Sequence, residues 1–365
     1  MTEIYIVSGV RTAIGTFGGS LAGFRPAELG TLVMKEAIAR AGVAPTDIEN
    51  VVVGTVVPTQ PKDAYVSRVA AVNAGIPIEA PAMNVNRLCG SGLQAIVSAC
   101  QAIALGEHSL AIGAGAEVMS GALRVMQGTR NGQKMGDLTL EDMMLGALHD
   151  PFEGIHMGVT AENVAERCGI SREQQDQVAA ESHRRAAAAI AAGYFKDQIV
   201  PVEIKTRKGV TVFDTDEHVR ADASVEAMAG LKPVFKKDGT VTAGNASGIN
   251  DGAAFFVLAD GSTAVNAGHK PMARLVSYAI AGVPNDIMGE GPIPASRLAL
   301  KKAGLTLDQM DVVESNEAFA AQALTVMRVL GLDPAKTNPN GGAIALGHPV
   351  GCSGAFIATK AIYEI

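Results

Sequence analysis

The order of apolar and polar positions predicts helices and buried strands that recur along the chain. Residues 36–43 have the spacing of an amphipathic helix that stops at a glycine, and residues 51–54 form a β-branched run typical of a buried strand. Residues 298–305 and 312–315 repeat this helix and strand, again joined by a short connection with an acidic residue. Each copy is half of a parallel-sheet unit, so the pattern predicts an α/β fold.

A second pair of similar segments follows the first pair in the same order. Residues 84–86 lead into the glycine turn 90–92 and an apolar helix, and residues 338–340 lead into the turn 351–354 and another apolar helix. Two matched pairs in one order indicate an internal duplication. Chance similarity between helix–turn–strand units is the alternative. We therefore expect two similar halves.

The region between the halves has a different pattern. Its Met-rich, Gly-rich and charged segments include an Ala-rich run that predicts a helix over 172–192. Long insertions often carry binding surfaces, and a phosphate-bearing ligand would account for the positive charge of this one. For any single residue, an ordinary surface charge is the simpler interpretation. The positive residues are Lys205, Arg207, Lys208, Arg220, Lys232, Lys236 and Lys237. We expect domains at 1–118, 119–248 and 249–365.

The composition is that of a compact globular protein. Of 365 residues, 48% are hydrophobic and 18% charged, which suffices for two or more core units. The net charge of −7 argues against a nucleic-acid or membrane-surface binder. The four cysteines include no C-x-x-C pair, so neither a disulfide framework nor a metal site is indicated. Residues 1–8 lack the features of a signal peptide, and we expect a cytoplasmic protein.

Cys89 follows a predicted strand and precedes a glycine turn and an apolar helix. This order places its sulfur at a helix N-terminus, where the macrodipole and free N–H groups favour the thiolate and lower the pKa. The glycines allow a substrate carbonyl to approach the backbone, whose N–H groups would form an oxyanion hole. An inert buried cysteine is the usual alternative, but the glycine turn favours a nucleophile.

His348 lies in a glycine- and proline-rich loop, residues 340–351, before the last helix. Such a loop has no packing reason to hold an imidazole, which suits a general base or a donor to an oxyanion. A surface loop histidine is the alternative. Because this loop occupies in the second half the place of Cys89 in the first, we expect a pseudo-twofold axis to bring the two residues together.

Two other polar turns are candidates for a ligand site. Asn316 ends the strand predicted at 312–314, at the carboxyl edge of a parallel sheet where such folds bind ligands; a helix N-cap is the alternative. Residues 245–254 form a similar turn before an apolar strand, with the same two interpretations. Residues 113–115 lack the third glycine of a dinucleotide fingerprint and no G-K-[ST] occurs, so nucleotide cofactors are disfavoured.

Taken together, these segments resemble the thiolase family, in particular the bacterial biosynthetic and broad-range β-ketothiolases. The resemblance covers essentially the whole chain. Each motif alone is a modest signal, but in this order the motifs are highly specific. They are residues 10–15, the Cys89 turn, and residues 156–163, 244–248, 316–319 and 347–349.

The resemblance implies a five-layered αβαβα core of two similar halves, an inserted loop domain that holds coenzyme A, and a homodimer or homotetramer. Cys89 would accept the acyl group from an acyl-CoA or a 3-ketoacyl-CoA, with His348 activating it. Asn316, through a water, and His348 would stabilise the enolate of a second acetyl-CoA. Coenzyme A would be a substrate, with no metal and no permanently bound cofactor. Positions that match the coenzyme A site are Leu148, His156, Met157, Arg220, Ala243, Ser247, Ala318 and Phe319.

The sequence departs from the thiolase pattern at its end. Thiolases carry a second catalytic cysteine in a C-x-G motif near the C-terminus, and this sequence ends before such a motif. Cys352 lies too close to His348, in the wrong context, to replace it. We therefore expect a truncated second half, either as a fragment of a longer enzyme or as a specialised relative, in which acylation of Cys89 survives and carbon–carbon bond formation is impaired.

The predicted activity is reversible condensation of acetyl-CoA with an acyl-CoA, or thiolysis of a 3-ketoacyl-CoA, as in fatty acid metabolism or polyhydroxyalkanoate biosynthesis. A β-ketoacyl synthase is a second enzyme hypothesis, which the Asn-Glu-Ala-Phe segment at 316–319 and the long loop domain disfavour. A non-catalytic or impaired acyl-CoA-binding relative is the third, favoured by the missing second cysteine.

Overall fold

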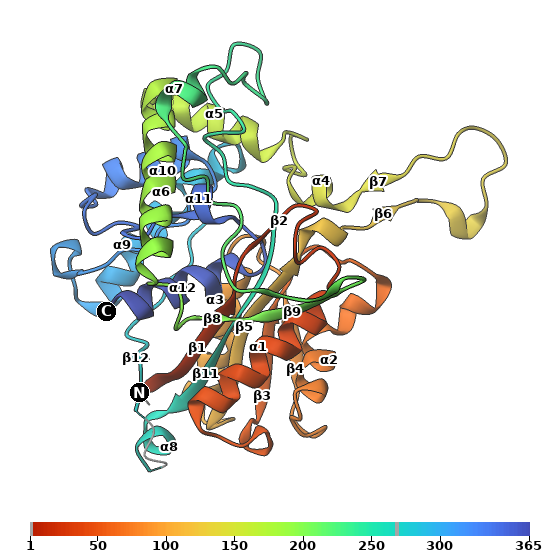
Figure 1. Cartoon of the computed structure of the whole chain (residues 1–365), viewed down its shortest axis with the longest axis vertical. Coiled ribbons are helices and arrows are strands. Elements are labelled where there is room, and N and C mark those ends of the chain that lie inside the picture. The colour runs from red at the N-terminus through yellow and green to blue at the C-terminus, as the bar shows by residue number, and fades with distance from the viewer. Residues whose placement is uncertain (1–2, 267–269) are drawn as a thin grey trace.

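The computed structural model describes residues 3–266 and 270–365 (Figure 1). Its centre is one eight-stranded sheet with the path β12-β1-β11-β5-β3-β4, to which β2 and β8 are joined at β11 and β1. The strands of this sheet are β1 (Ile4–Thr12), β2 (Gly15–Thr16), β3 (Asn50–Gly54), β4 (Ala82–Val85), β5 (Leu110–Val118), β8 (Ile199–Val200), β11 (Asn250–Asp260) and β12 (Ala273–Arg274).

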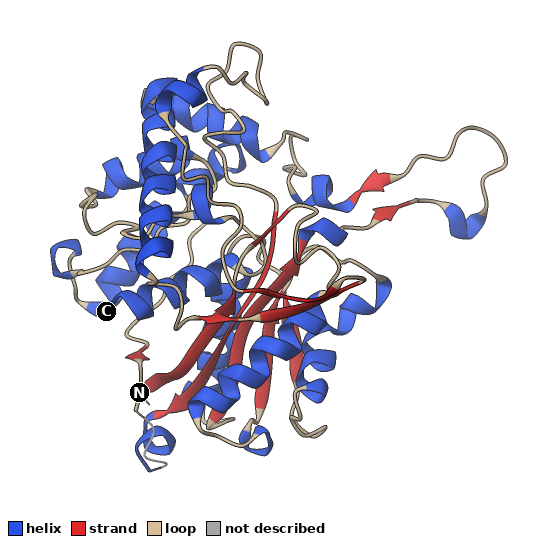
Figure 2. Cartoon of the chain, viewed as in Figure 1, coloured by secondary structure: helices blue, strands red, loops and turns tan. Residues whose placement is uncertain are grey.

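Helices pack against the sheet and alternate with loops over the rest of the described chain (Figure 2). They are α1 (Pro26–Ala41), α2 (Val66–Asn73), α3 (Ser91–Ala104), α4 (Met143–Ala147), α5 (Met157–Cys168), α6 (Arg172–Ala192), α7 (Val225–Ala229), α8 (Gly261–Asn266), α9 (Pro292–Ala303), α10 (Ala320–Leu330), α11 (Ala343–Leu346) and α12 (Ser353–Glu364). Among the described residues, none of these helices combines the length and the apolar character needed to cross a membrane.

Strand β5 separates the two helical layers that cover the sheet. It is buried along its whole length, so its side chains alternate between two covered faces. On one face Ala116 lies near Gly30 of α1. On the other face Gly113 lies against Ile96 of α3. Helix α2 packs on α1, and α12 packs on α3. The C-terminal helix therefore lies on the same face of the sheet as α3.

Strand β11 enters the sheet from far along the chain. It lies between β1 and β5 and is antiparallel to both, with Asp251 opposite Val118 and Ala259 opposite Leu110. All of its residues are buried, as expected for a strand at the centre of a covered sheet. The sequence predicted a boundary at residue 249, whereas strand pairing joins residues 250–260 to the first half.

The second half contains less sheet than its sequence pattern predicts. The strand expected at 312–314 is limited to an isolated parallel bridge between Val313 and Thr337. Two backbone hydrogen bonds hold this bridge, from Val313 N–H to the Lys336 carbonyl and from Asn338 N–H to the Val313 carbonyl, both 2.9 Å. The segment is therefore extended and paired, but in the described residues it forms a single bridge rather than a ladder.

The insertion between the halves consists of helices and two small hairpins. Helix α6 has the bounds that its Ala-rich run predicts, with a capping box between Ser171 and Gln174 at its start and left-handed Gly193 at its end. Strands β9 (Val202–Thr206) and β10 (Gly209–Phe213) form one hairpin. Strands β6 (Arg124–Val125) and β7 (Glu141–Asp142) form the base of an arm that projects from the molecule (Figure 1).

A fully buried arginine joins three parts of the chain. The guanidinium of Arg11 in β1 forms a bidentate ion pair with Asp216 in the insertion, at 2.8 and 3.0 Å. Its Nε donates to Gln198 at 2.7 Å. The group lies between the rings of Phe195 and Phe356, with centroid distances of 5.0 and 4.7 Å. Because a buried charge requires such partners, Arg11 fixes the insertion and α12 against the central sheet.

Candidate active site

The first turns of α3 and α12 meet at two glycines. A Cβ atom on Gly92 would lie 2.7 Å from the Ala355 nitrogen, and one on Gly354 would lie 2.3 Å from the Leu93 nitrogen. Only glycine allows this backbone approach. The sequence repeat pairs these two turns, so the two loops that precede the helices come together.

The Cys89 turn is a tight turn that ends β4 and starts α3. Leu88 has a φ of 44°, the left-handed region that leucine rarely adopts. The Ser91 hydroxyl accepts a hydrogen bond from Arg87 N–H at 2.8 Å and donates to the Leu88 carbonyl at 2.7 Å. These bonds hold the strained backbone, and Cys89 is exposed to solvent.

The loop of His348 is buried. His348 has 6% of its surface exposed, and its backbone N–H donates to Asn250 Oδ1 at 2.9 Å. Asn250 in turn donates to the Gly15 carbonyl at 3.0 Å, which ties the loop to the central sheet. The Nε2 atom of His348 lies 3.2 Å from Cys89 Sγ. The proximity that the repeat predicts is thus present in the structure; the catalytic roles of both residues stay predictions.

The two side chains favour their neutral forms. Burial lowers the pKa of His348 to about 4. The protein atoms packed around the sulfur raise the pKa of the Cys89 thiol to about 11, and the Glu117 carboxyl adds to that rise. The hypothesis that the helix N-terminus lowers this pKa stays a prediction, since Cys89 is exposed and α3 begins two residues later.

Glu117 lies beneath both loops and was not singled out from the sequence. It is fully buried near the end of β5 and accepts backbone N–H groups from Val56, Val57 and Gly351 at 2.8 to 3.0 Å. Burial raises its pKa to about 8. Because Gly351 belongs to the His348 loop, this carboxyl joins the first half to the second. A single acidic residue in the apolar run 110–118 was the available signal.

Asn316 does not cap a helix, so that alternative is wrong. Helix α10 begins at Ala320 with Phe319 at the N-cap position. The Oδ1 atom of Asn316 is buried and has no hydrogen-bond partner among the described residues. Buried acceptors of this kind are normally satisfied by a water or a ligand. The described protein atoms thus leave this acceptor unsatisfied.

Two family models match consecutive parts of the chain. "Thiolase, N-terminal domain" matches residues 4–262, and "Thiolase, C-terminal domain" matches residues 269–365. The chain belongs to the thiolase family. The family and the α/β fold predicted from the sequence motifs are therefore confirmed.

Relatives of known identity resemble this thiolase over its full length. It is 62% identical to the "Beta-ketothiolase BktB" of Cupriavidus necator, over all of this chain and 92% of that protein. It is 49% identical to an acetyl-CoA acetyltransferase of Allochromatium vinosum, with the same coverage. The solved structure of human mitochondrial 3-ketoacyl-CoA thiolase superposes with a TM-score of 0.97 at 44% identity, over 100% of this chain and 92% of that one.

The residues predicted for coenzyme A form two groups in this thiolase. Met157, Ala318 and Phe319 belong to one apolar cluster, and Ser247 N–H donates to the Ala318 carbonyl at 3.0 Å. Leu148 packs against a second cluster, which includes Val350 of the His348 loop. The two groups are joined because Met157 N–H donates to the Leu148 carbonyl at 2.8 Å.

Arg220 and Ala243 are less closely connected to these groups. Both are exposed. The backbone N–H of Arg220 donates to His183 at 3.1 Å, and the Arg220 side chain has no hydrogen bond or ion pair among those described. It is therefore free to meet an anionic group.

An aromatic side chain that the sequence prediction missed completes the first group. Phe235 stacks on His156 with a ring separation of 4.6 Å and meets Phe319 edge-on at 6.1 Å. It lies between Val234 and the lysines at 236 and 237, so an aromatic within a positive run was the only local signal. Phe235 therefore forms an apolar wall between the predicted contacts His156 and Phe319.

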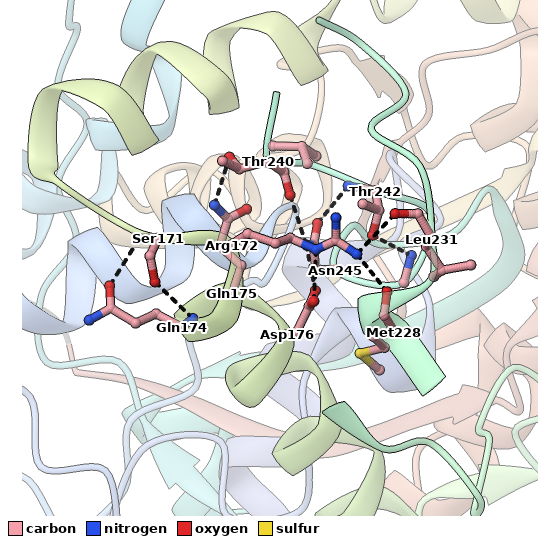
Figure 3. A network of polar contacts seen from close by, with 12 residues as sticks. Ser171, Arg172, Gln174, Gln175, Asp176, Met228, Leu231, Thr240, Thr242 and Asn245 are labelled. Carbon is pink, nitrogen blue, oxygen red and sulfur yellow. Dashed lines mark hydrogen bonds and ion pairs between the residues drawn. The ribbon is translucent and has the colours of Figure 1, made fainter. Parts of the chain in front are cut away.

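A polar network fixes the turn that carries Ala243 and Ser247 (Figure 3). The amide of Asn245 accepts from Thr242 N–H at 2.8 Å and donates to Asp176 of α6 at 2.8 Å. Its backbone carbonyl accepts the N–H of Ala320 at 2.9 Å. Asn245 is fully buried and links α6, this turn and the start of α10. The turn of the predicted coenzyme site and the segment after Asn316 thus share one support.

Proposed function

We propose that this thiolase is an acetyl-CoA C-acyltransferase, a β-ketothiolase that transfers acyl groups through a thioester on Cys89. The observation that supports this proposal most directly is the 3.2 Å contact between Cys89 Sγ and His348 Nε2. The chain that contains this contact is 62% identical to a β-ketothiolase. A cysteine and a neutral imidazole at hydrogen-bond distance are the parts that nucleophilic acyl transfer needs.

Acylation follows from the protonation states of this pair. Neutral His348 takes the proton of the Cys89 thiol at Nε2, and the sulfur attacks the thioester carbonyl. The carbon–sulfur bond to coenzyme A then breaks, and the departing thiolate takes the proton back from His348. Because the pKa of His348 is lowered to about 4, the imidazolium is a strong acid and returns this proton readily.

The second half-reaction involves Asn316 and His348. The buried Oδ1 of Asn316, without a partner among the described residues, fits a bound water that would donate to the enolate oxygen of a second acetyl-CoA. His348 would donate to the same oxygen while Nε2 carries a proton. The enolate forms only when a base takes the α-proton of that acetyl-CoA, and no described residue is assigned this role. The enolate carbon then bonds to the acyl carbon, the carbon–sulfur bond to Cys89 breaks, and the Cys89 thiolate is released.

Coenzyme A is the substrate carrier in this proposal, and the insertion 119–248 is its binding domain. The apolar cluster around Met157, Phe235 and Phe319 suits a pantetheine chain, and exposed Arg220 suits a phosphate. One of the similar solved structures, at 43% identity and a TM-score of 0.96, is the human mitochondrial 3-ketoacyl-CoA thiolase in complex with CoA.

We further propose a cytoplasmic homodimer or homotetramer. Strand β4 is an edge of the sheet, and along and beyond it Met83, Leu88 and Leu93 have exposed fractions of 50%, 46% and 46%. Unpaired edges with apolar side chains are typical sites of association. The arm between β6 and β7 also exposes Met135 and Leu138. A second subunit on β4 would cover the Cys89 turn.

The proposed reaction is tested by acetylation and thiolysis of the full chain. Intact-mass measurement after incubation with acetyl-CoA should show one acetyl group, mapped to Cys89 by peptide analysis, and acetoacetyl-CoA should be consumed when coenzyme A is added. Cys89→Ala should abolish both signals. Cys168→Ala is the matched control, since that half-buried cysteine lies at the end of α5, and it should retain both. A persistent adduct in Cys89→Ala would rule out the proposed nucleophile.

The second candidate function is an acyl-CoA-binding protein with impaired catalytic activity, and the position of Cys352 favours it. Among the described residues, Cys352 is the cysteine nearest to His348 in sequence, and it is fully buried, with a pKa raised by burial. It therefore cannot exchange the α-proton of acetyl-CoA. Binding of coenzyme A without an adduct supports this candidate, and an adduct without acetoacetyl-CoA thiolysis indicates that only the first half-reaction proceeds.

A further inference from the structure

The imidazole of His348 has a second partner on the side away from Cys89. Its Nδ1 atom lies 2.5 Å from the hydroxyl oxygen of Ser353 in the first turn of α12. That hydroxyl also donates to the Pro349 carbonyl at 2.9 Å. The same carbonyl accepts the backbone N–H of Ser353, also at 2.9 Å, which fixes its position. Ser353 is 1% exposed, so water does not compete for these bonds.

The single hydrogen of the hydroxyl decides which imidazole nitrogen carries a proton. When this hydrogen is directed to Pro349, the Ser353 oxygen can only accept, and Nδ1 must carry the proton. The lone pair of Nε2 then points at the Cys89 thiol. When the hydroxyl donates to Nδ1 instead, Nε2 carries the proton and cannot accept another from sulfur. Only the first arrangement makes His348 a base.

We propose that Ser353 is a positioning residue that holds His348 as the Nδ1–H tautomer, with its Nε2 lone pair directed at Cys89. The inference rests on the proposed function, since it concerns the base of that reaction. During acylation the S–H bond breaks and an Nε2–H bond forms. The Ser353 hydroxyl keeps its own hydrogen, and the imidazolium donates Nδ1–H to it until the leaving thiolate takes the Nε2 proton.

A hydroxyl in this place differs from a carboxylate in its effect on His348. A carboxylate would stabilise the imidazolium with a charge-assisted bond and keep the histidine protonated. A neutral acceptor orients the ring without that effect, which agrees with a pKa lowered by burial to about 4. Ser353 thus fixes the orientation of the base and leaves it unprotonated between turnovers.

The internal repeat supplies an independent observation. Ser91, at the matching position before the glycine of the first repeat, is fully buried and likewise accepts one hydrogen bond and donates another to a carbonyl of its own turn. There the accepted hydrogen comes from the backbone of Arg87. In the second repeat it comes from the side chain of His348. The same buried serine therefore shapes the turn in one copy and orients the base in the other.

Several titratable groups surround His348 and could contribute to the pH dependence of its reactions. Cys89 faces Nε2 from the turn before α3. Glu117 on β5 contacts the loop through Gly351 N–H, and Cys352 precedes Ser353 at the start of α12. Asp251 on β11 is bonded to Ser120. Of these, Cys89 is the group whose alkylation can be followed directly.

The test is the pH dependence of Cys89 alkylation by iodoacetamide, read by peptide mass spectrometry between pH 5 and 9. In the wild type, His348 assists at low pH and gives a plateau, above which direct attack by the thiolate gives a rising alkaline limb. Ser353→Ala should lower the plateau about tenfold or more, since a hydrogen bond to a charged group is lost, and leave the alkaline limb unchanged. Ser353→Thr keeps the hydroxyl and should keep the plateau.

Matched variants separate this inference from the proposed function. Thr359→Val removes a buried hydroxyl bonded to the Ala355 carbonyl in the same helix at 3.0 Å, without contact to His348, and should leave both limbs unchanged. His348→Ala should remove the plateau. A plateau kept in Ser353→Ala but lost in His348→Ala overturns the inference and leaves the function standing. A plateau kept in both overturns the base itself. A low plateau in Ser353→Thr with an intact alkaline limb also overturns the inference.

Discussion

The Cys89 turn and the His348 loop occupy matching places in the repeat, yet they differ in burial and strain. The first exposes Cys89 and Leu88 and holds Leu88 at a φ of 44°. The second leaves His348 only 6% exposed and anchors its backbone to Asn250. The copies share a buried serine and a glycine contact. What differs is access to solvent, which a nucleophile needs to meet its substrate and a neutral base must avoid.

His348→Ala would have the largest effect, because it removes the buried partner. General base catalysis typically contributes 10²- to 10⁴-fold, so we expect acetylation of Cys89 by acetyl-CoA to slow by about 10³-fold. Rapid quenching followed by mass spectrometry measures this rate. His108→Ala, before β5 and at the opposite end of that strand from Glu117, is the control and should acetylate normally. Equal rates in the two variants would contradict a role for the buried loop.

Gly354→Ala would separate the two loops while leaving their side chains intact. Its Cβ would lie 2.3 Å from the Leu93 nitrogen, so α12 must shift away from α3. Overpacking of this kind costs about 1 to 3 kcal/mol, and we expect the free energy of unfolding in urea to fall by that amount. Gly304→Ala, in left-handed backbone but with open space, is a comparison: it should also lose stability but keep the acetylation rate per folded molecule. Unchanged acetylation in Gly354→Ala would show that the glycine contact does not set the site.

Glu117 should make stability depend on pH through the buried loop. Its folded pKa of about 8 lies above its ordinary value of 4.5, so the folded state holds a proton that the unfolded state has released. Its contribution is full below pH 4.5 and is lost as pH rises towards 8. Between pH 6 and 7 we expect wild type to lose about 1 kcal/mol relative to Glu117→Gln, measured by urea unfolding. Parallel curves for the two proteins would contradict this assignment.

Leu88→Gly should have the smallest effect, because it relieves the strain of the exposed turn. A non-glycine residue in left-handed backbone is strained by about 1 to 3 kcal/mol, and the added flexibility of the unfolded chain offsets part of the gain. We expect a gain of about 0.5 kcal/mol in the free energy of unfolding. Leu105→Gly, at a more exposed leucine with a φ of −81°, should lose stability instead. Loss of stability in both variants would mean that Leu88 is not strained.

Much of the fold and of the site was predicted from local sequence patterns. The Ala-rich run gave the bounds of α6 because helix propensity and the capping residues lie within the run itself. The proximity of Cys89 and His348 followed from the internal repeat, since the two residues occupy matching places in the two halves. Motif order gave the family, which the two matching family models confirm.

Several other contacts between distant segments could not be predicted from the sequence. An all-apolar strand such as β11 does not encode its neighbours, so its position between β1 and β5 could not be predicted from its own residues. The stacking of Phe235 on His156 joins segments about 80 residues apart by number. The position of Glu117 beneath both loops depends on the complete fold, which a single acidic residue in an apolar run does not report. Roles for Asn316 and the coenzyme contacts stay predictions.

Arg11 has a consequence for cutting and rejoining the chain. Its charge is neutralised by Asp216 and enclosed by Phe356, so neither the first 118 residues nor the remainder contains the whole arrangement. A separately produced N-terminal fragment would hold an unpaired guanidinium on an open apolar face and should be poorly soluble alone. Co-production of the two fragments would restore its neighbours, which makes fragment complementation, rather than isolated-domain expression, the practical route to labelling one half for spectroscopy.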